Sequence, residues 1–155
     1  MATGTVKWFD QALLDLGKKI HDLSANTFKI GIVTTGTVPT HSTAAPCWGA
    51  AGSTNMSTNE CAHATAYTSP ITLTTVTWTI VSNVPTFRAD IVTIAQDAGG
   101  FTNGAYGIIY NDTNANKQCI GFVELSSTGS ITLVAGSLTI DWSGATNDIL
   151  TLTQS

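Results

Sequence analysis

Short segments that alternate apolar and polar residues, each followed by turn-forming residues, fill the second half of the chain. Strands at a spacing of roughly eight to twelve residues are typical of all-β sandwiches and barrels. We therefore expect a mainly β fold, an antiparallel β-sandwich or jelly-roll-like domain of about eight strands with one N-terminal α-helix. The last segments of this series span residues 105–110, 118–125, 131–134, 138–142 and 149–153.

The N-terminal part of the chain carries a different period. Apolar residues recur there at intervals of three and four, which predicts an amphipathic helix rather than a strand. On this interpretation the two aromatic residues at its start face the core. The residues that carry the period are Trp8, Phe9, Ala12, Leu13, Leu16, Ile20 and Leu23.

Alternation predicts further strands between the helix and the final series. Residues 27–35 are expected to form a strand with its isoleucines on one face. Residues 70–81 alternate with one change of phase at Thr74 and Thr75, where we expect a β-bulge. Pro85 is expected to end that strand, because proline cannot donate to a strand ladder.

The length of 155 residues fits a single domain, residues 1–155, with a hydrophobic core of its own. Residues 1–23 form an N-terminal arm and helix, residues 36–66 a long loop, and residues 67–155 the main strand-rich part. The loop is rich in small and turn-forming residues, and a loop of this length is unusual inside a compact domain. We expect a neighbouring molecule to hold this loop if it is ordered.

Charged residues make up only 10% of the chain, and the net charge is -4. An ordinary soluble domain has roughly 25% charged residues, so threonine, serine, asparagine and glycine replace them here. A neutral surface of this kind suits contact with other proteins. We find neither a run long enough to span a membrane nor a secretory signal, and expect no membrane partner and synthesis in a cytosol.

Catalytic and metal-binding signatures are weak. No nucleophile motif accompanies His21, His41 or His63, so we expect no enzymatic activity and no cofactor. The best metal ligands by residue type are Cys47, Cys61 and His63, with His41 nearby in sequence, but their spacing is not that of a zinc site. We therefore expect no metal, and we interpret the three cysteines, the third being Cys119, as buried apolar residues.

The opening residues 4–9, GTVKWF, resemble the start of bacterial cold-shock proteins. Those domains continue into two aromatic strands on which bases stack, and neither strand follows here. Six lysines and arginines face ten acidic residues, whereas nucleic-acid affinity depends on basic patches. We expect no nucleic-acid partner.

Six segments of the chain carry a family resemblance: WFDQALLDLGKKIHDL from residue 8, FKIGIVTT from 28, AYGIIYNDT from 105, GFVEL from 121, LTIDW from 138 and DILTLT from 148. Through them the chain resembles, over nearly its full length, a group of small virion proteins encoded among the head and tail genes of tailed bacteriophages. It departs from their pattern at AHATAYTS, residues 62–69, and in the order of its C-terminal segment.

The resemblance implies a structural protein of the virion, most simply a capsid decoration or cement protein that stabilises the head by protein contacts. Its partners would be the major capsid protein or other virion proteins, together with self-association as a dimer or trimer; copies could also align edge to edge. The family offers no catalytic residue. A tail tube, neck or adaptor component, and a ligand-binding or receptor-binding β-sandwich module, remain alternatives.

Contact with partners is expected from the N-terminal segment and the long loop. Trp48 is an aromatic residue among small ones, which suits an anchor at an interface, although it could equally fold back on its own sheet. The predicted contact residues are Met1, Ala2, Thr3, Val6, Lys7, Pro39, Pro46 and Trp48.

Overall fold

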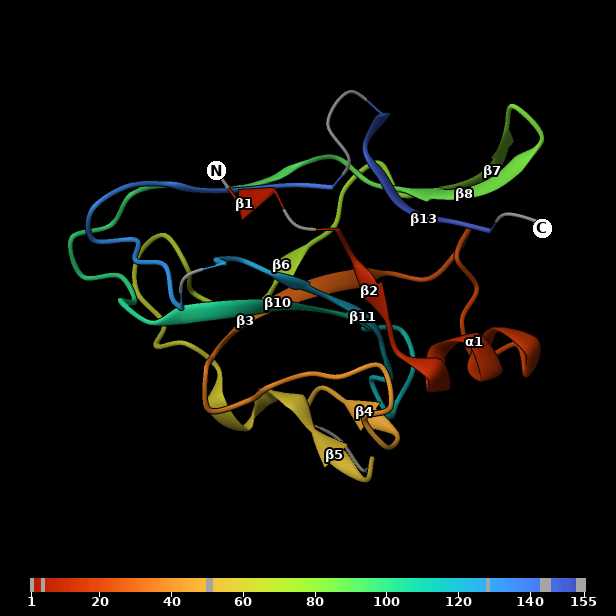
Figure 1. Cartoon of the computed structure of the whole chain (residues 1–155), viewed down its shortest axis with the longest axis horizontal. Coiled ribbons are helices and arrows are strands. Elements are labelled where there is room, and N and C mark those ends of the chain that lie inside the picture. Colours follow the sequence, from red (N-terminus) through yellow and green to blue (C-terminus); the bar gives the residue numbers. More distant parts are fainter. Residues whose placement is uncertain (1, 4, 50–51, 128, 143–145, 153–155) are drawn as a thin grey trace.

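A computed structural model describes the chain except for residues 1, 4, 50–51, 128, 143–145 and 153–155. The described part is mainly β, with one N-terminal helix and several antiparallel sheets, as the sequence predicted. Figure 1 shows its elements arranged in layers, with the longest strands in the middle.

The middle layer, the central sheet, contains five antiparallel strands in the order β2-β11-β10-β3-β6. Its three long strands are buried along most of their length, because other parts of the chain cover both faces. The near-continuous apolar composition of these strands follows from this double burial. The strands are β2 (Lys7–Trp8), β11 (Cys119–Glu124), β10 (Gly104–Asn111), β3 (Phe28–Thr34) and β6 (Ile71–Thr72).

Two three-stranded sheets cover one face of the central sheet (Figure 1). The rings of Phe28 in β3 and Phe87 in β8 meet edge to face with centroids 5.2 Å apart, and so join the layers. The first sheet contains β1 (Ala2–Thr3), β12 (Leu138–Asp141) and β9 (Val92–Ile94), and the second contains β13 (Asp148–Thr151), β8 (Val84–Arg88) and β7 (Thr77–Val81).

The long loop, residues 36–66, covers the opposite face of the central sheet (Figure 1). It contains the parallel pair β4 (Pro46–Cys47) and β5 (Thr54–Asn55), and a 3-10 helix, η1 (Met56–Asn59). Trp48 stacks on Tyr110 of β10, with ring centroids 5.1 Å apart and an interplanar angle of 1°. The loop is therefore packed on the chain's own sheet through this stack, and its contact with a neighbouring molecule stays a prediction.

The N-terminal helix is shorter than its apolar period predicted. Helix α1 covers Asp10–Gly17, and Trp8 belongs to strand β2, where it pairs with Gly121. Phe9 is fully buried and its ring lies 5.2 Å from that of Phe122, so its predicted core position is confirmed. The exposed side chain of Leu13 contradicts the predicted apolar face, since the buried residues of α1 are Ala12 and Asp15.

The phase change in residues 70–81 marks a break between sheets and not the predicted bulge. Strand β6 pairs with β3 in the central sheet, whereas β7 pairs with β8 in the covering layer. Thr75, between them, has a φ of 51°, which turns the chain from one sheet to the other.

Pro85 lies inside β8 and does not end the strand as predicted. It pairs with Ile80, and its carbonyl accepts a hydrogen bond from the backbone N–H of Leu152. A proline fits here because its nitrogen is not needed as a donor. Residues 131–134, also predicted as a strand, contribute only an isolated bridge between Ile131 and Gly104.

The Gly31→Ala substitution tests the packing of the long loop on the central sheet. A Cβ at this position would lie 2.0 Å from the indole of Trp48, so Trp48 or the strand must move. We expect a loss of about 1–3 kcal/mol in the free energy of unfolding, measured by urea titration with tryptophan fluorescence. Gly17→Ala is the control, because a Cβ there meets nothing within 4 Å. Equal transition midpoints for both variants would contradict this account.

Candidate protein interface

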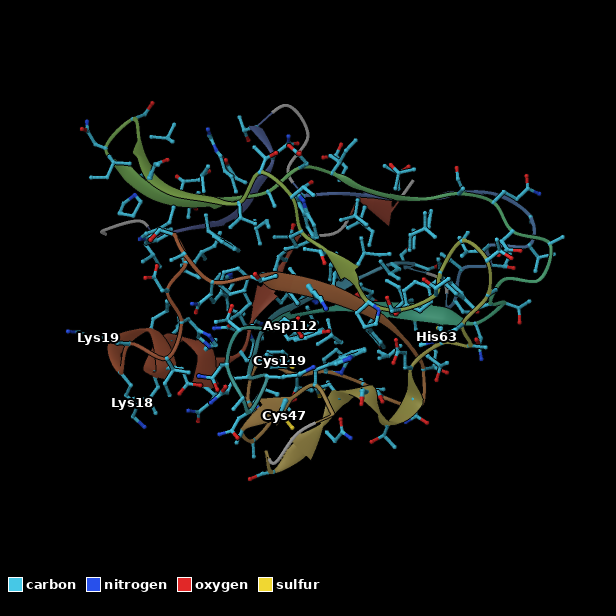
Figure 2. All side chains as sticks on the ribbon, turned by 180° about the vertical axis from the view of Figure 1, so that it is seen from behind. Lys18, Lys19, Cys47, His63, Asp112 and Cys119 are labelled. Atoms are coloured by element: carbon cyan, nitrogen blue, oxygen red, sulfur yellow. The ribbon has the colours of Figure 1, made fainter. Side chains whose placement is uncertain are left out.

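The candidate metal ligands do not come together. Figure 2 shows Cys47 beside Cys119 and well separated from His63. His63 instead lies 2.9 Å from the Glu60 carboxylate, and the Nδ1 atom of His41 lies 2.7 Å from the carbonyl oxygen of Trp8. Among the described residues, no group of three or more His, Cys, Asp or Glu side chains is placed to hold a metal ion.

The three cysteines are buried and carry thiols. Burial raises the pKa of Cys61 to about 12, with a further contribution from the charge of Glu60. Burial likewise raises the pKa of Cys119 well above its usual value. Thiols held in this state are poor nucleophiles at neutral pH, in agreement with their interpretation as small core residues.

Most of the predicted contact residues are occupied within the chain itself. Among the predicted contact residues whose burial the structure describes, only Lys7 is exposed, with its Nζ atom 6.0 Å from the ring centroid of Phe122. Ala2 and Thr3 pair in parallel with β12, and Met1 lies outside the described residues. The remaining predicted contact residues are all buried: Val6, Pro39, Pro46 and Trp48. Trp48 thus folds back on its own sheet, which was the second of the two possibilities that the sequence left open.

Four of the seven large apolar side chains that are exposed among the described residues belong to α1, the β7–β8 hairpin and the residue after β13. These three elements lie at the same end in Figure 1, with α1 on one side and the hairpin on the other. We call this surface the hairpin end. Its exposed members are Leu13 (49% exposed), Leu14 (52%), Ile80 (73%) and Leu152 (40%). Their elements lie at one end of the molecule, which makes this end the candidate interaction surface.

A groove of about 390 Å³ connects the two sides of the hairpin end. Its lining includes Leu16 of α1, Trp78 of β7 and Leu152. Lys19 and Asp22 supply opposite charges to its lining. The groove therefore combines apolar and charged side chains in its lining, an arrangement that suits a side chain from another protein.

The β7–β8 hairpin is held in shape by its turn. Ser82 and Asn83 have φ angles of 49° and 67°, so both central residues of this two-residue turn are left-handed. That geometry is the type I′ turn, whose twist matches that of the two strands. The hairpin thus presents Ile80 on a defined strand and not on an irregular loop.

A buried polar network forms the base of the groove at His21. The Nδ2 amide of Asn111 lies 3.2 Å from Nδ1 of His21, and it also donates to Asn26 Oδ1 at 2.7 Å. The Nε2 atom of His21 is buried without a hydrogen-bond partner, 3.9 Å from an Asp15 carboxylate oxygen. Burial lowers the pKa of His21 to about 4, although the charge of Asp15 opposes this shift. His21 is therefore neutral at pH 7.

Comparison with known proteins adds no relative. No family model matches the chain, and no curated protein or solved structure matches it either. Within the described residues, no helix is long and apolar enough to cross a membrane.

The hairpin end was missed by the sequence analysis. The alternation across residues 70–81 correctly indicated strand structure at Trp78 and Ile80, but it gave no indication that Ile80 is exposed. A usable signal was the two-residue Ser82–Asn83 turn between two alternating runs, which is typical of a hairpin. Alternation gives the face of a strand but does not show how far that strand extends beyond its neighbours.

The pKa of His21 predicts a pH-dependent stability. The unfolded chain binds a proton at His21 below about pH 6.5, whereas the folded chain binds it only near pH 4. The contribution of neutral His21 to the free energy of unfolding is therefore fully present above about pH 6.5. It is lost as the pH falls toward 4, by up to about 3 kcal/mol. Urea titrations at several pH values should show a smaller loss for His21→Gln than for the natural chain. Parallel pH profiles of the two proteins would refute this assignment.

Proposed function

We propose that this chain is a structural protein that acts by binding other proteins, specifically as a capsid decoration or cement protein of a tailed bacteriophage. The observation that carries the proposal is the group of exposed apolar side chains at the hairpin end. The resemblance of the sequence to small virion proteins supplies the virion setting.

The composition of the surface supports contact through apolar and neutral polar groups. With charged residues at 10% of the chain, few ions must be stripped of water when the surface is covered. Apolar contact is also screened little by salt, unlike the pairing of surface charges. Binding through the hairpin end should therefore persist at ionic strengths that dissociate charge-driven complexes.

The layered fold supports a protein that binds as a rigid body. The long loop is packed on the central sheet through Trp48, and α1 through Phe9. Since these segments are already ordered, association loses little further conformational entropy. In a shell of many copies, modest contacts of this kind sum to a large stabilisation of the assembly.

Co-sedimentation with empty capsids from the same source tests the proposal. The natural chain should saturate the capsids at a fixed ratio, with an affinity that changes little with salt. Leu14→Glu should weaken binding by about tenfold or more, because it places a charge on the apolar surface while keeping a good helix former in α1. Val38→Glu is the matched control, since Val38 is 62% exposed but belongs to the long loop.

Three outcomes would contradict the proposal. Equal loss of binding for Leu14→Glu and Val38→Glu would remove the hairpin end as the contact surface. Rings or tubes that ignore capsids would instead support a tail component. A folded chain that binds no virion protein would favour the ligand-binding alternative.

A further inference from the structure

Strand β7 is the longest exposed edge among the sheets of the described chain. It spans five residues, Thr77–Val81, and pairs only with β8 on one side. The other strands at sheet edges span two to four residues. Natural proteins commonly protect such an edge with a charge, a proline or a bulge. The sequence TWTIV has no charge or proline, and the β7–β8 register has no shift.

The hairpin turn determines which backbone groups face the open edge. In a hairpin with a two-residue turn, the flanking pair Val81 and Val84 exchange both hydrogen bonds, and bonded pairs then alternate along the ladder. Thr79 is therefore bonded to Thr86, whereas Trp78 and Ile80 direct their N–H and C=O groups away from β8. These groups can be satisfied only by water or by another extended strand.

We propose that β7 pairs with β7 of a second copy of this chain, antiparallel and about a two-fold axis at Thr79. In this register Trp78 of one copy lies opposite Ile80 of the other, and the two positions exchange N–H···O=C bonds in both directions. The β13-β8-β7 sheets of the two copies then become one sheet of six strands. This inference rests on the proposed function only in that both assign the hairpin to protein contact.

The side chains of β7 are complementary to themselves in this register. Trp78 and Ile80 have the same parity and so project from the same face of the strand. Ile80 is 73% exposed, and pairing would place it beside the indole of Trp78 from the other copy. Aromatic and β-branched side chains directly opposite each other stabilise a pair of strands. No like charges are brought together, because β7 has none.

A second copy is favoured over an unrelated strand because one symmetric register does two things at once. It gives hydrogen-bond partners to the outward backbone groups of Trp78 and Ile80, and it places their apolar side chains in contact. The contact is small, since a five-residue strand pair lies below the roughly 1,200 Å² of a stable interface. The dimer is therefore weak in dilute solution. On a repeating surface, neighbouring copies would be held at a high effective concentration, which strengthens the same contact.

Cross-linking through Thr79→Cys tests the pairing directly. Thr79 would face its own counterpart at a non-hydrogen-bonded pair, where Cα atoms lie about 4.5 Å apart, within disulfide range. We expect mild oxidation to give a covalent dimer at least about tenfold faster than for Thr93→Cys, an exposed threonine on the edge strand β9. Equal rates for the two variants would indicate random collision and overturn the pairing.

Sedimentation of the natural chain provides the second measurement. A monomer–dimer equilibrium is expected as the concentration rises from about 1 µM to about 1 mM, and Ile80→Lys should raise its dissociation constant by at least about tenfold. Val38→Lys is the matched control, and equal behaviour of the two variants would overturn the pairing. The Leu14→Glu variant should still dimerise, because Leu14 lies outside β7. A natural chain that binds capsids but stays monomeric up to about 1 mM would refute this inference alone. A natural chain that dimerises but binds no capsids would refute the proposed function alone.

Discussion

The stack of Trp48 on Tyr110, in the space left by Gly31, is the contact on which the arrangement of this chain depends. It fastens a loop with little regular structure to the middle of the central sheet. Without it, one face of that sheet would lose its cover, and the buried apolar strands would be exposed to water. The aromatic residue best suited by type to bind a partner is thus committed to internal packing.

In the proposed function, contact with partners is consequently assigned to a different part of the molecule. The hairpin end combines a helix surface, a groove and an open strand edge, and together they offer two kinds of contact. The groove and the helix accept apolar side chains, whereas β7 offers backbone hydrogen bonds. If the proposed function and the proposed pairing of β7 hold, contacts with a shell and with neighbouring copies are made by adjacent surfaces of one end.

The sequence predicted the fold class and the strands β3, β10 and β11 because both faces of these strands are buried and their residues are strongly apolar. It predicted the end of α1 poorly, since the apolar period continues past Gly17 into a turn that buries Leu23 separately. The position of Trp48 depends on Gly31 and Tyr110, which are distant along the chain. A local pattern contains no information about such a contact. The candidate interface was missed for a related reason, because exposure depends on where neighbouring layers end.

The three buried thiols give this chain built-in reporters of its internal motion. Cys47 lies in the loop covering, Cys119 in the central sheet and Cys61 beside β3, bonded through its N–H to the carbonyl of Ile32. A thiol reagent reaches such a group only when the surrounding structure opens. The relative labelling rates would therefore order the layers by how often each separates from the next. Such a ranking would show which layer of the molecule separates from its neighbour most readily.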